Sequence, residues 1–130
     1  MAAPLIFVST FRVKDGDLEG LKGYYRRVLG IVEANEPRAI AFHGFLSEDG
    51  TELTSIQVHP DAASFEFHLQ VLRDNWEDSF SQYASMMEGY RIDYYGATPP
   101  ESALAMDREM GIDPGVKPIH IAGFTRAQTS

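Results

Sequence analysis

The sequence predicts an α+β fold in which strands and helices follow one another in the order β-α-β-β-α-β, with a C-terminal addition. Two long stretches carry apolar residues at helical spacing, and four short runs rich in β-branched and aromatic residues lie around them. Between two of these runs stands Asp49-Gly50, a strong signal for a β-hairpin. This order is the ferredoxin-like plan, an antiparallel sheet with helices on one face.

The first strand and the first helix occupy the N-terminal part of the chain. Residues 5–13 are rich in β-branched and aromatic side chains, which predicts a strand. From Leu18, apolar residues recur at the spacing of one helical face as far as Val32. The helix is expected to end by Glu36, because the residue before Pro37 is disfavoured in the helical conformation.

Residues 39–46 and 53–59 predict the two strands of the hairpin. With the Asp-Gly pair at the turn, His43 is expected to lie opposite Ile56. Both faces of this hairpin carry large apolar side chains, whereas an uncovered antiparallel sheet usually has one polar face. We therefore expect each face of the hairpin to be covered by other parts of the protein or by a partner chain.

A second helical region follows the hairpin and carries an apolar stripe, with a break expected near residues 73–75. Residues 90–95 alternate between apolar and polar side chains and predict a fourth strand. The remaining residues, 97–130, predict an arm that holds a short helix at 101–110 and an extra terminal strand at 118–125.

The size and composition of the chain are those of one globular domain. It has 130 residues, 44% of them apolar and 23% charged, so we expect a single domain over residues 1–130 with the ferredoxin-like core in residues 4–96. The net charge is −8, and residues 47–130 carry fourteen acidic against five basic side chains. This balance argues against binding to nucleic acid or to an anionic membrane, because both require basic surfaces.

The chain has no cysteine, which excludes a disulfide framework, a cysteine-ligated zinc site, an iron–sulfur cluster and a thiol nucleophile. It also has no uncharged apolar run of about 18 residues, the length that a membrane-spanning helix needs. We therefore expect a cytoplasmic protein that does not enter a membrane.

Helices of the ferredoxin-like plan cover one face of the sheet, but the predicted strands are apolar on both faces. A second copy of the same sheet is the economical cover for the other face. We therefore expect a homodimer closed around a barrel-like core. In such a dimer the terminal strand at 118–125 is placed to pair with the edge of the partner's sheet.

Residues 4–96 resemble the dimeric α+β barrel superfamily, and within it the antibiotic biosynthesis monooxygenase branch. The resemblance rests on the first strand, the Glu36-Pro37 exit from the first helix, the hairpin, and the segment 55–63, which leads into a helix carrying His68. Members include cofactor-free monooxygenases acting on quinols and polycyclic phenols, haem-degrading enzymes, isomerases and proteins with no assigned activity. The resemblance therefore implies the fold more than the chemistry.

The chain departs from the family pattern in two places. Cofactor-free oxygenases and haem-degrading members commonly carry an asparagine in the first strand, where this chain has Ser9 and Thr10 as its polar positions. Haem-degrading members also carry a tryptophan upstream of the helix histidine, whereas Trp76 lies downstream of His68. The resemblance therefore disfavours haem degradation.

His68 is the first candidate for a catalytic residue. It lies three residues after Phe65 and four before Leu72, on or beside the apolar stripe, where an imidazole can act as a base toward a phenolic hydroxyl. The alternative is a half-buried histidine that packs the helix on the sheet. His43 is the second candidate, and its strand face can line either a pocket with His68 or the contact with a partner. His59, at a strand end, is expected to be exposed.

Four further residues are candidates for contact with an aromatic substrate: Trp76, Phe80, Tyr83 and Arg91. The three aromatic residues extend the apolar stripe and can form a flat slot with the Tyr83 hydroxyl as its polar group, or can simply belong to the core. Arg91 can bind a substrate carboxylate or phenolate, or form a surface ion pair with Asp93.

We expect neither a metal nor a cofactor, since no histidine pair has the spacing of metal ligands and no glycine-rich phosphate loop follows a strand. The sequence leaves several functions open for a protein that takes a small hydrophobic or aromatic ligand. The first is a cofactor-independent monooxygenase acting on an aromatic or quinol-type molecule. The second is a non-catalytic binding or structural dimer of the same fold, and an isomerase or cyclase on that scaffold is the third.

Overall fold

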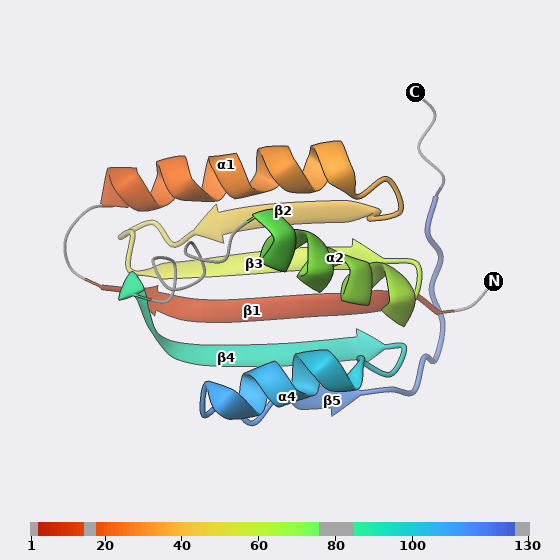
Figure 1. The fold of residues 1–130 in the computed structure, drawn as a ribbon. Coiled ribbons are helices and arrows are strands. Elements are labelled where there is room, and N and C mark those ends of the chain that lie inside the picture. The colour runs from red at the N-terminus through yellow and green to blue at the C-terminus, as the bar shows by residue number, and fades with distance from the viewer. Residues whose placement is uncertain (1–2, 15–17, 76–84, 127–130) are drawn as a thin grey trace.

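The computed structural model describes residues 3–14, 18–75 and 85–126, which form strands and helices in the order β1, α1, β2, β3, α2, β4, α4, β5 (Figure 1). The strands are β1 (Leu5–Val13), β2 (Ala41–Leu46), β3 (Glu52–His59), β4 (Met87–Gly96) and β5 (Gly115–Lys117). The helices are α1 (Leu18–Asn35), α2 (Ala62–Asn75) and α4 (Glu101–Glu109).

The strands form one sheet in the order β2-β3-β1-β4-β5. The first four strands pair antiparallel, with β1 between β3 and β4, which is the ferredoxin-like arrangement. The predicted α+β fold class is therefore confirmed. The complete sheet is mixed, however, because β5 runs parallel to β4. A parallel neighbour requires a crossover connection, and the segment that contains α4 supplies it.

The hairpin of β2 and β3 has the predicted register, with His43 opposite Ile56. Asp49 holds the turn, since its Oδ1 accepts hydrogen bonds from the hydroxyl and the amide of Thr51 and from the hydroxyl of Ser47. These bonds hold the pKa of the Asp49 carboxyl at about 2. Gly50 has a φ of 74°, a conformation that the turn requires and that glycine adopts without strain.

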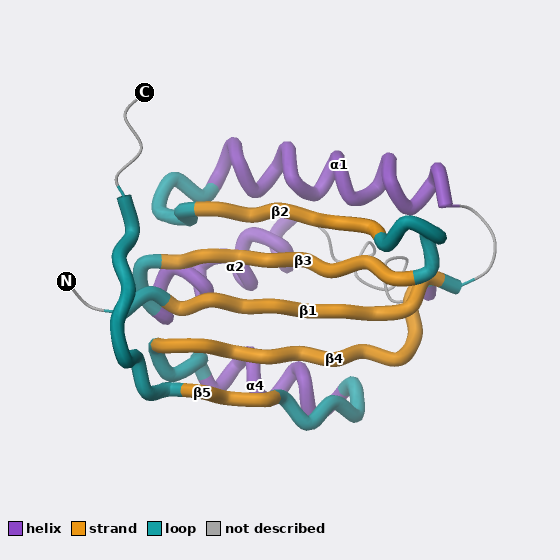
Figure 2. The backbone as a smooth tube through the Cα atoms, turned by 180° about the vertical axis from the view of Figure 1, so that it is seen from behind, coloured by secondary structure: helices purple, strands orange, loops and turns teal. Residues whose placement is uncertain are grey.

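The helices α1, α2 and α4 lie on one face of the sheet (Figure 1), and the view from behind shows the strands of the other face uncovered (Figure 2). Alternate residues of each strand point to the helices, and the buried Leu5, Phe11 and Leu53 belong to that set. The residues between them form the uncovered surface, called here the helix-free face. It includes Ile6, Val8, Thr10, His43, Phe45, Ile56 and Val58, and on β4 also Arg91, Asp93 and Tyr95.

The chain turns from β4 toward α4 at Gly96, which has a φ of 91°. A Cβ at this position would overlap the carbonyl oxygen of Pro4, so only glycine allows this turn. Two prolines then precede Glu101, the first residue of α4, where a missing amide hydrogen costs the helix nothing. The helix lies against β4 with Ala103 and Asp107 buried.

The extra C-terminal strand exists, but its predicted position at 118–125 is wrong. The strand is β5, and pairing with β4 ends at Lys117 because Pro118 has no amide hydrogen to continue the ladder. Beyond it an arm runs across the ends of the strands (Figures 1 and 2). Ile119 and Ile121 of this arm are 82% and 94% exposed. Contact of the arm with a partner subunit stays a prediction.

Candidate functional site

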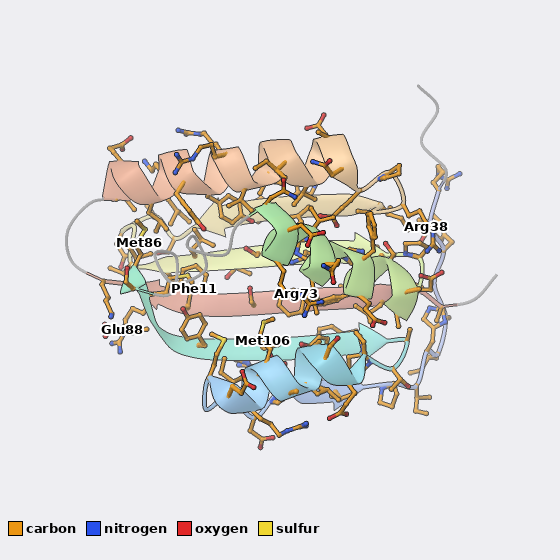
Figure 3. All side chains as sticks on the ribbon, in the orientation of Figure 1. Phe11, Arg38, Arg73, Met86, Glu88 and Met106 are labelled. Atoms are coloured by element: carbon orange, nitrogen blue, oxygen red, sulfur yellow. The ribbon has the colours of Figure 1, made fainter. Side chains whose placement is uncertain are left out.

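A cavity of about 450 Å³ lies between the helix-covered face of the sheet and the helices. Phe11, Arg73 and Met106 line it from β1, α2 and α4, and Figure 3 labels all three. Its walls are mostly apolar and include the rings of Phe7, Phe42, Phe65, Tyr24, Tyr90 and Tyr94. A cavity of this size, with few polar groups among aromatic rings, is typical of a site for a small organic molecule.

His68 lines the cavity and forms a buried pair with Glu36, which is not one of the lining residues. Nδ1 of His68 lies 2.8 Å from Oε2 and 3.0 Å from Oε1 of Glu36, and the exposed fractions of the two residues are 2% and 4%. The imidazole lies 5.5 Å from the ring of Phe42 and 6.0 Å from that of Phe65, centroid to centroid. Within the described part of the chain, Nε2 of His68 makes no hydrogen bond, and the residue lines the cavity.

Local sequence places both members of the pair. On α2, helical spacing puts Phe65, His68 and Leu69 on the buried side. Glu36 directly follows the last residue of α1, and its amide still donates to the carbonyl oxygen of Val32 at 2.9 Å. Pro37 cannot continue the helix. The Glu36 side chain therefore sits where α1 ends, within reach of α2.

Glu36 is a site residue that the sequence patterns do not single out. An acidic side chain at the C-terminal end of a helix is unfavourable, because the helix dipole disfavours negative charge there. This misplaced charge beside a proline is the signal that could have pointed to a special role. Its partner lies 32 residues away in the sequence, so the pair itself becomes visible only in the fold.

His59 is fully buried, so the expectation that it is exposed is wrong. Its Nδ1 lies 2.8 Å from the Ser64 hydroxyl, and its Nε2 lies 3.0 Å from Oε1 of Gln57. Burial, together with the nearby His68, lowers the pKa of His59 to about 4. With both ring nitrogens bonded, His59 is a structural residue that joins the end of β3 to the start of α2.

Tyr25, Tyr90 and Tyr94, three residues that line the cavity, each have a phenolic hydroxyl with a raised pKa. The Tyr25 hydroxyl lies 2.8 Å from that of Ser55, and burial raises the pKa of Tyr25 to about 12. Burial raises the pKa of Tyr90 to about 12 as well, and its buried hydroxyl has no hydrogen-bond partner among the described residues. Tyr94 donates to Oδ2 of Asp107 at 2.6 Å, and burial raises its pKa above the usual value. All three phenols therefore keep their proton at neutral pH.

The structure does not bring His43 or Arg91 to the cavity. His43 is exposed on the helix-free face, 6.2 Å from the ring of Phe45 between centroids. Arg91 lies on β4 opposite Thr10, and its Nε donates to Oδ2 of Asp93 at 3.1 Å. Of the two placements that the sequence leaves open for His43, the fold thus selects the face where we expect a partner subunit.

The aromatic slot predicted from Trp76, Phe80 and Tyr83 falls on residues 76–84, outside the described residues. It stays a prediction. The last described residue before this segment is Asn75, where α2 ends and where the sequence predicts a break.

In residues 3–14, 18–75 and 85–126, no three histidine, aspartate or glutamate side chains are grouped so that they could hold a metal ion. Within the same ranges, none of the helices is long and apolar enough to cross a membrane.

No protein-family model and no curated protein matches the sequence, but solved structures match the fold. MupZ from Pseudomonas fluorescens has a TM-score of 0.68 and 18% identity, and the match covers 95% of this chain and 94% of that one. A variant of SnoaB from Streptomyces nogalater, a cofactor-independent oxygenase, has a TM-score of 0.59 and 16% identity, with 70% and 91% covered. An antibiotic biosynthesis monooxygenase has a TM-score of 0.60 and 15% identity, with 73% and 99% covered.

Identities this low establish a shared fold but not a shared reaction. The match to MupZ spans nearly the whole chain and so extends beyond β4 into the segment that contains α4. In agreement with the fold that the sequence resemblance implies, the chain shares its fold with these three proteins, one of which is an antibiotic biosynthesis monooxygenase.

Proposed function

We propose that the protein is a cofactor-independent monooxygenase that acts on an aromatic or quinol-type small molecule. The observation that carries this proposal is that His68 lines an apolar cavity of about 450 Å³ while its Nδ1 is bonded to the buried carboxylate of Glu36. A histidine positioned by a carboxylate is a common general base. The likeness of the fold to SnoaB, described as a cofactor-independent oxygenase, supports the same class of reaction.

His68 acts as the base in this mechanism. An ionised Glu36 carboxylate can only accept a hydrogen bond, so it holds the proton on Nδ1 and leaves the lone pair of Nε2 for the ligand. Nε2 then takes the proton of the substrate's phenolic hydroxyl, and Glu36 stabilises the resulting imidazolium. The phenolate that forms is electron-rich and reacts with dioxygen directly.

The net reaction requires no external reductant. The phenolic hydroxyl becomes one carbonyl of a quinone, and a ring carbon that loses its hydrogen receives one oxygen atom as the other carbonyl. The second oxygen atom leaves as water with the hydroxyl hydrogen and the ring hydrogen. The protein's part is to hold the ring among aromatic side chains, to move one proton and to exclude bulk water.

Oxygen uptake tests the proposal. Chelator-treated protein is expected to accelerate oxygen consumption in the presence of 1-naphthol. His68→Ala should lower the enzymatic rate by about a hundredfold or more, the usual contribution of a general base. Glu66→Gln, which changes an exposed carboxylate on the same helix, should leave the rate unchanged.

Other results of the oxygen-uptake experiment would favour a different assignment. Oxygen uptake that survives His68→Ala removes His68 from the role of base. Tight binding by the wild type without any turnover favours the non-catalytic binding dimer, and conversion of the ligand without oxygen uptake favours an isomerase or cyclase.

The same fold supports a homodimer joined through the helix-free face. No described helix covers this face, and its central residues include Ile6, Val8, Ile56 and Val58 (Figure 2). Phe45, at its margin, is 57% exposed. Ile6 pairs with Val58 and Val8 with Ile56, so the centre of the face is apolar. An apolar sheet centre is normally covered by another protein surface, and a second copy of the sheet is complementary to it in size and character.

A further inference from the structure

A second buried polar pair, Tyr94 and Asp107, lines the same cavity. The Tyr94 hydroxyl, on β4, donates a hydrogen bond of 2.6 Å to Oδ2 of Asp107, on α4. Both side chains are buried, with exposed fractions of 1% and 4%. The proposed oxygenation makes no use of this pair, so its presence in the wall of the cavity requires another explanation.

The two pairs come from different parts of the fold, and His68, Tyr94 and Asp107 line the same cavity. His68 and Glu36 belong to α2 and to the end of α1, whereas Tyr94 and Asp107 belong to β4 and α4. The Phe65 ring contacts both, at centroid distances of 6.0 Å to His68 and 5.9 Å to Tyr94. One ligand with an apolar body can therefore meet a polar group of the protein at each end.

Asp107 has acceptor capacity that the described residues leave unused. Tyr94 bonds to one carboxyl oxygen, and no hydrogen bond from a described residue reaches the other. None of the ion pairs in the described ranges includes Asp107, and the neighbouring Arg108 is paired with Glu101 instead. Burial accordingly raises the pKa of Asp107. Because Asp107 lines the cavity, its second carboxyl oxygen can accept a hydrogen bond from a ligand there.

We propose that Asp107, held in place by Tyr94, is a specificity-determining residue that accepts a hydrogen bond from a hydroxyl at the end of the substrate remote from His68. The inference rests on the proposed function and narrows its substrate class to aromatic compounds with hydroxyls at two ends. One hydroxyl meets the His68–Glu36 pair, the other meets Asp107, and the aromatic walls hold the rings between them. A ligand without the second hydroxyl leaves the Asp107 acceptor unpaired and binds more weakly.

Calorimetric titration of the full-length protein without oxygen tests this assignment, because turnover is then blocked. The probes are 1-naphthol and the dihydroxynaphthalenes whose second hydroxyl lies on the other ring. At least one dihydroxynaphthalene is expected to bind the wild type about tenfold more tightly than 1-naphthol does. Asp107→Asn should remove that advantage and leave the affinity for 1-naphthol within about twofold, since the amide still accepts from Tyr94 but presents N–H to the ligand.

Two further variants separate recognition from folding. Tyr94→Phe keeps the carboxylate but removes the bond that orients it, so it should reduce the same preference. Asp113→Asn changes an exposed carboxylate just beyond α4 and should reduce nothing. The assignment is overturned if no dihydroxynaphthalene binds more tightly than 1-naphthol. It is also overturned if Asp107→Asn weakens both kinds of probe equally, which is the behaviour of a purely structural residue.

This experiment and the oxygen-uptake experiment fail independently. If the binding preference depends on Asp107 but the protein consumes no oxygen, the recognition role of Asp107 stands and the monooxygenase activity is ruled out. If the protein consumes oxygen but shows no preference for the second hydroxyl, the monooxygenase activity stands and the recognition role of Asp107 is ruled out.

Discussion

The carboxylate of Glu36 and Nδ1 of His68 lie 2.8 Å apart, and their side chains are only 2% and 3% exposed. This contact joins the C-terminal end of α1 to the middle of α2, so it connects two helices that cover the same face of the sheet. It also fixes the orientation of the imidazole at the cavity wall. The pair thus has two roles: it holds α1 and α2 together, and it orients His68 for catalysis. Variants of Glu36 distinguish the effect on stability from the effect on activity.

Glu36→Gln is expected to lower oxygen uptake by about a hundredfold, because an amide can donate to Nδ1 and so move the ring proton to Nε2, where the base is needed. Glu36→Ala should in addition lower the free energy of unfolding by about 1–3 kcal/mol, since a buried imidazole nitrogen loses its partner. An oxygen electrode and urea unfolding measure the two effects. Glu33→Gln, an exposed acid on α1, serves as the control. Unchanged uptake in Glu36→Gln contradicts a role of Glu36 through His68.

The buried His59 is expected to make stability depend on pH. Its pKa falls from 6.5 to about 4 in the folded protein, so below about pH 6.5 the unfolded chain binds a proton that the folded chain does not. The free energy of unfolding should therefore decrease as the pH falls from about 6.5 to about 4. His59→Asn should flatten this part of the profile in urea unfolding, whereas His120→Gln, at an exposed position, should not. A slope in His59→Asn equal to that of the wild type would assign the proton to another group.

Gly44 on β2 leaves room for the Tyr25 ring, which a Cβ at position 44 would overlap. Gly44→Ala is therefore expected to lower the free energy of unfolding by about 1–3 kcal/mol and to weaken binding in the cavity, because Tyr25 lines it. Gly30→Ala on α1 is the matched control, since a Cβ there meets nothing within 4 Å. It should raise the free energy of unfolding by about 0.5–1 kcal/mol. Equal effects of the two substitutions in urea unfolding would contradict this packing.

Native mass spectrometry tests the homodimer. The wild type should appear at twice the chain mass of 14.5 kDa, and any additional mass would identify a bound ligand. Ile56 lies between Val8 and His43 on the helix-free face, so Ile56→Glu should give a monomer with an unchanged far-ultraviolet spectrum, because a charge buried without a partner is costly. Ala63→Glu, on the exposed side of α2, should remain dimeric. A monomeric wild type, or a dimer that survives Ile56→Glu, contradicts the proposed interface.

Local patterns suffice for most of the elements. β1 spans the predicted residues 5–13, and α1 ends one residue before Glu36. The hairpin register is correct because the turn chemistry and the alternation of side chains both act within a few residues. The terminal strand shows the limit of such patterns. Residues 118–125 have the composition of a strand, but a strand also needs a neighbouring edge, and β4 pairs instead with residues 115–117.

Sequence alone thus establishes the fold class, the hairpin register and His68 as a candidate, since each follows from periodicity or turn chemistry over a short stretch. The tertiary packing of the helices and strands determines which residues come together in the site. It puts His43 and His68 on opposite faces of the sheet, buries His59, and brings His68 to a carboxylate 32 residues away. It also brings Tyr94 to Asp107, 13 residues away, across the turn from β4 to α4. Contacts of this range depend on how helices and strands meet in space, and no local spacing in the sequence encodes them.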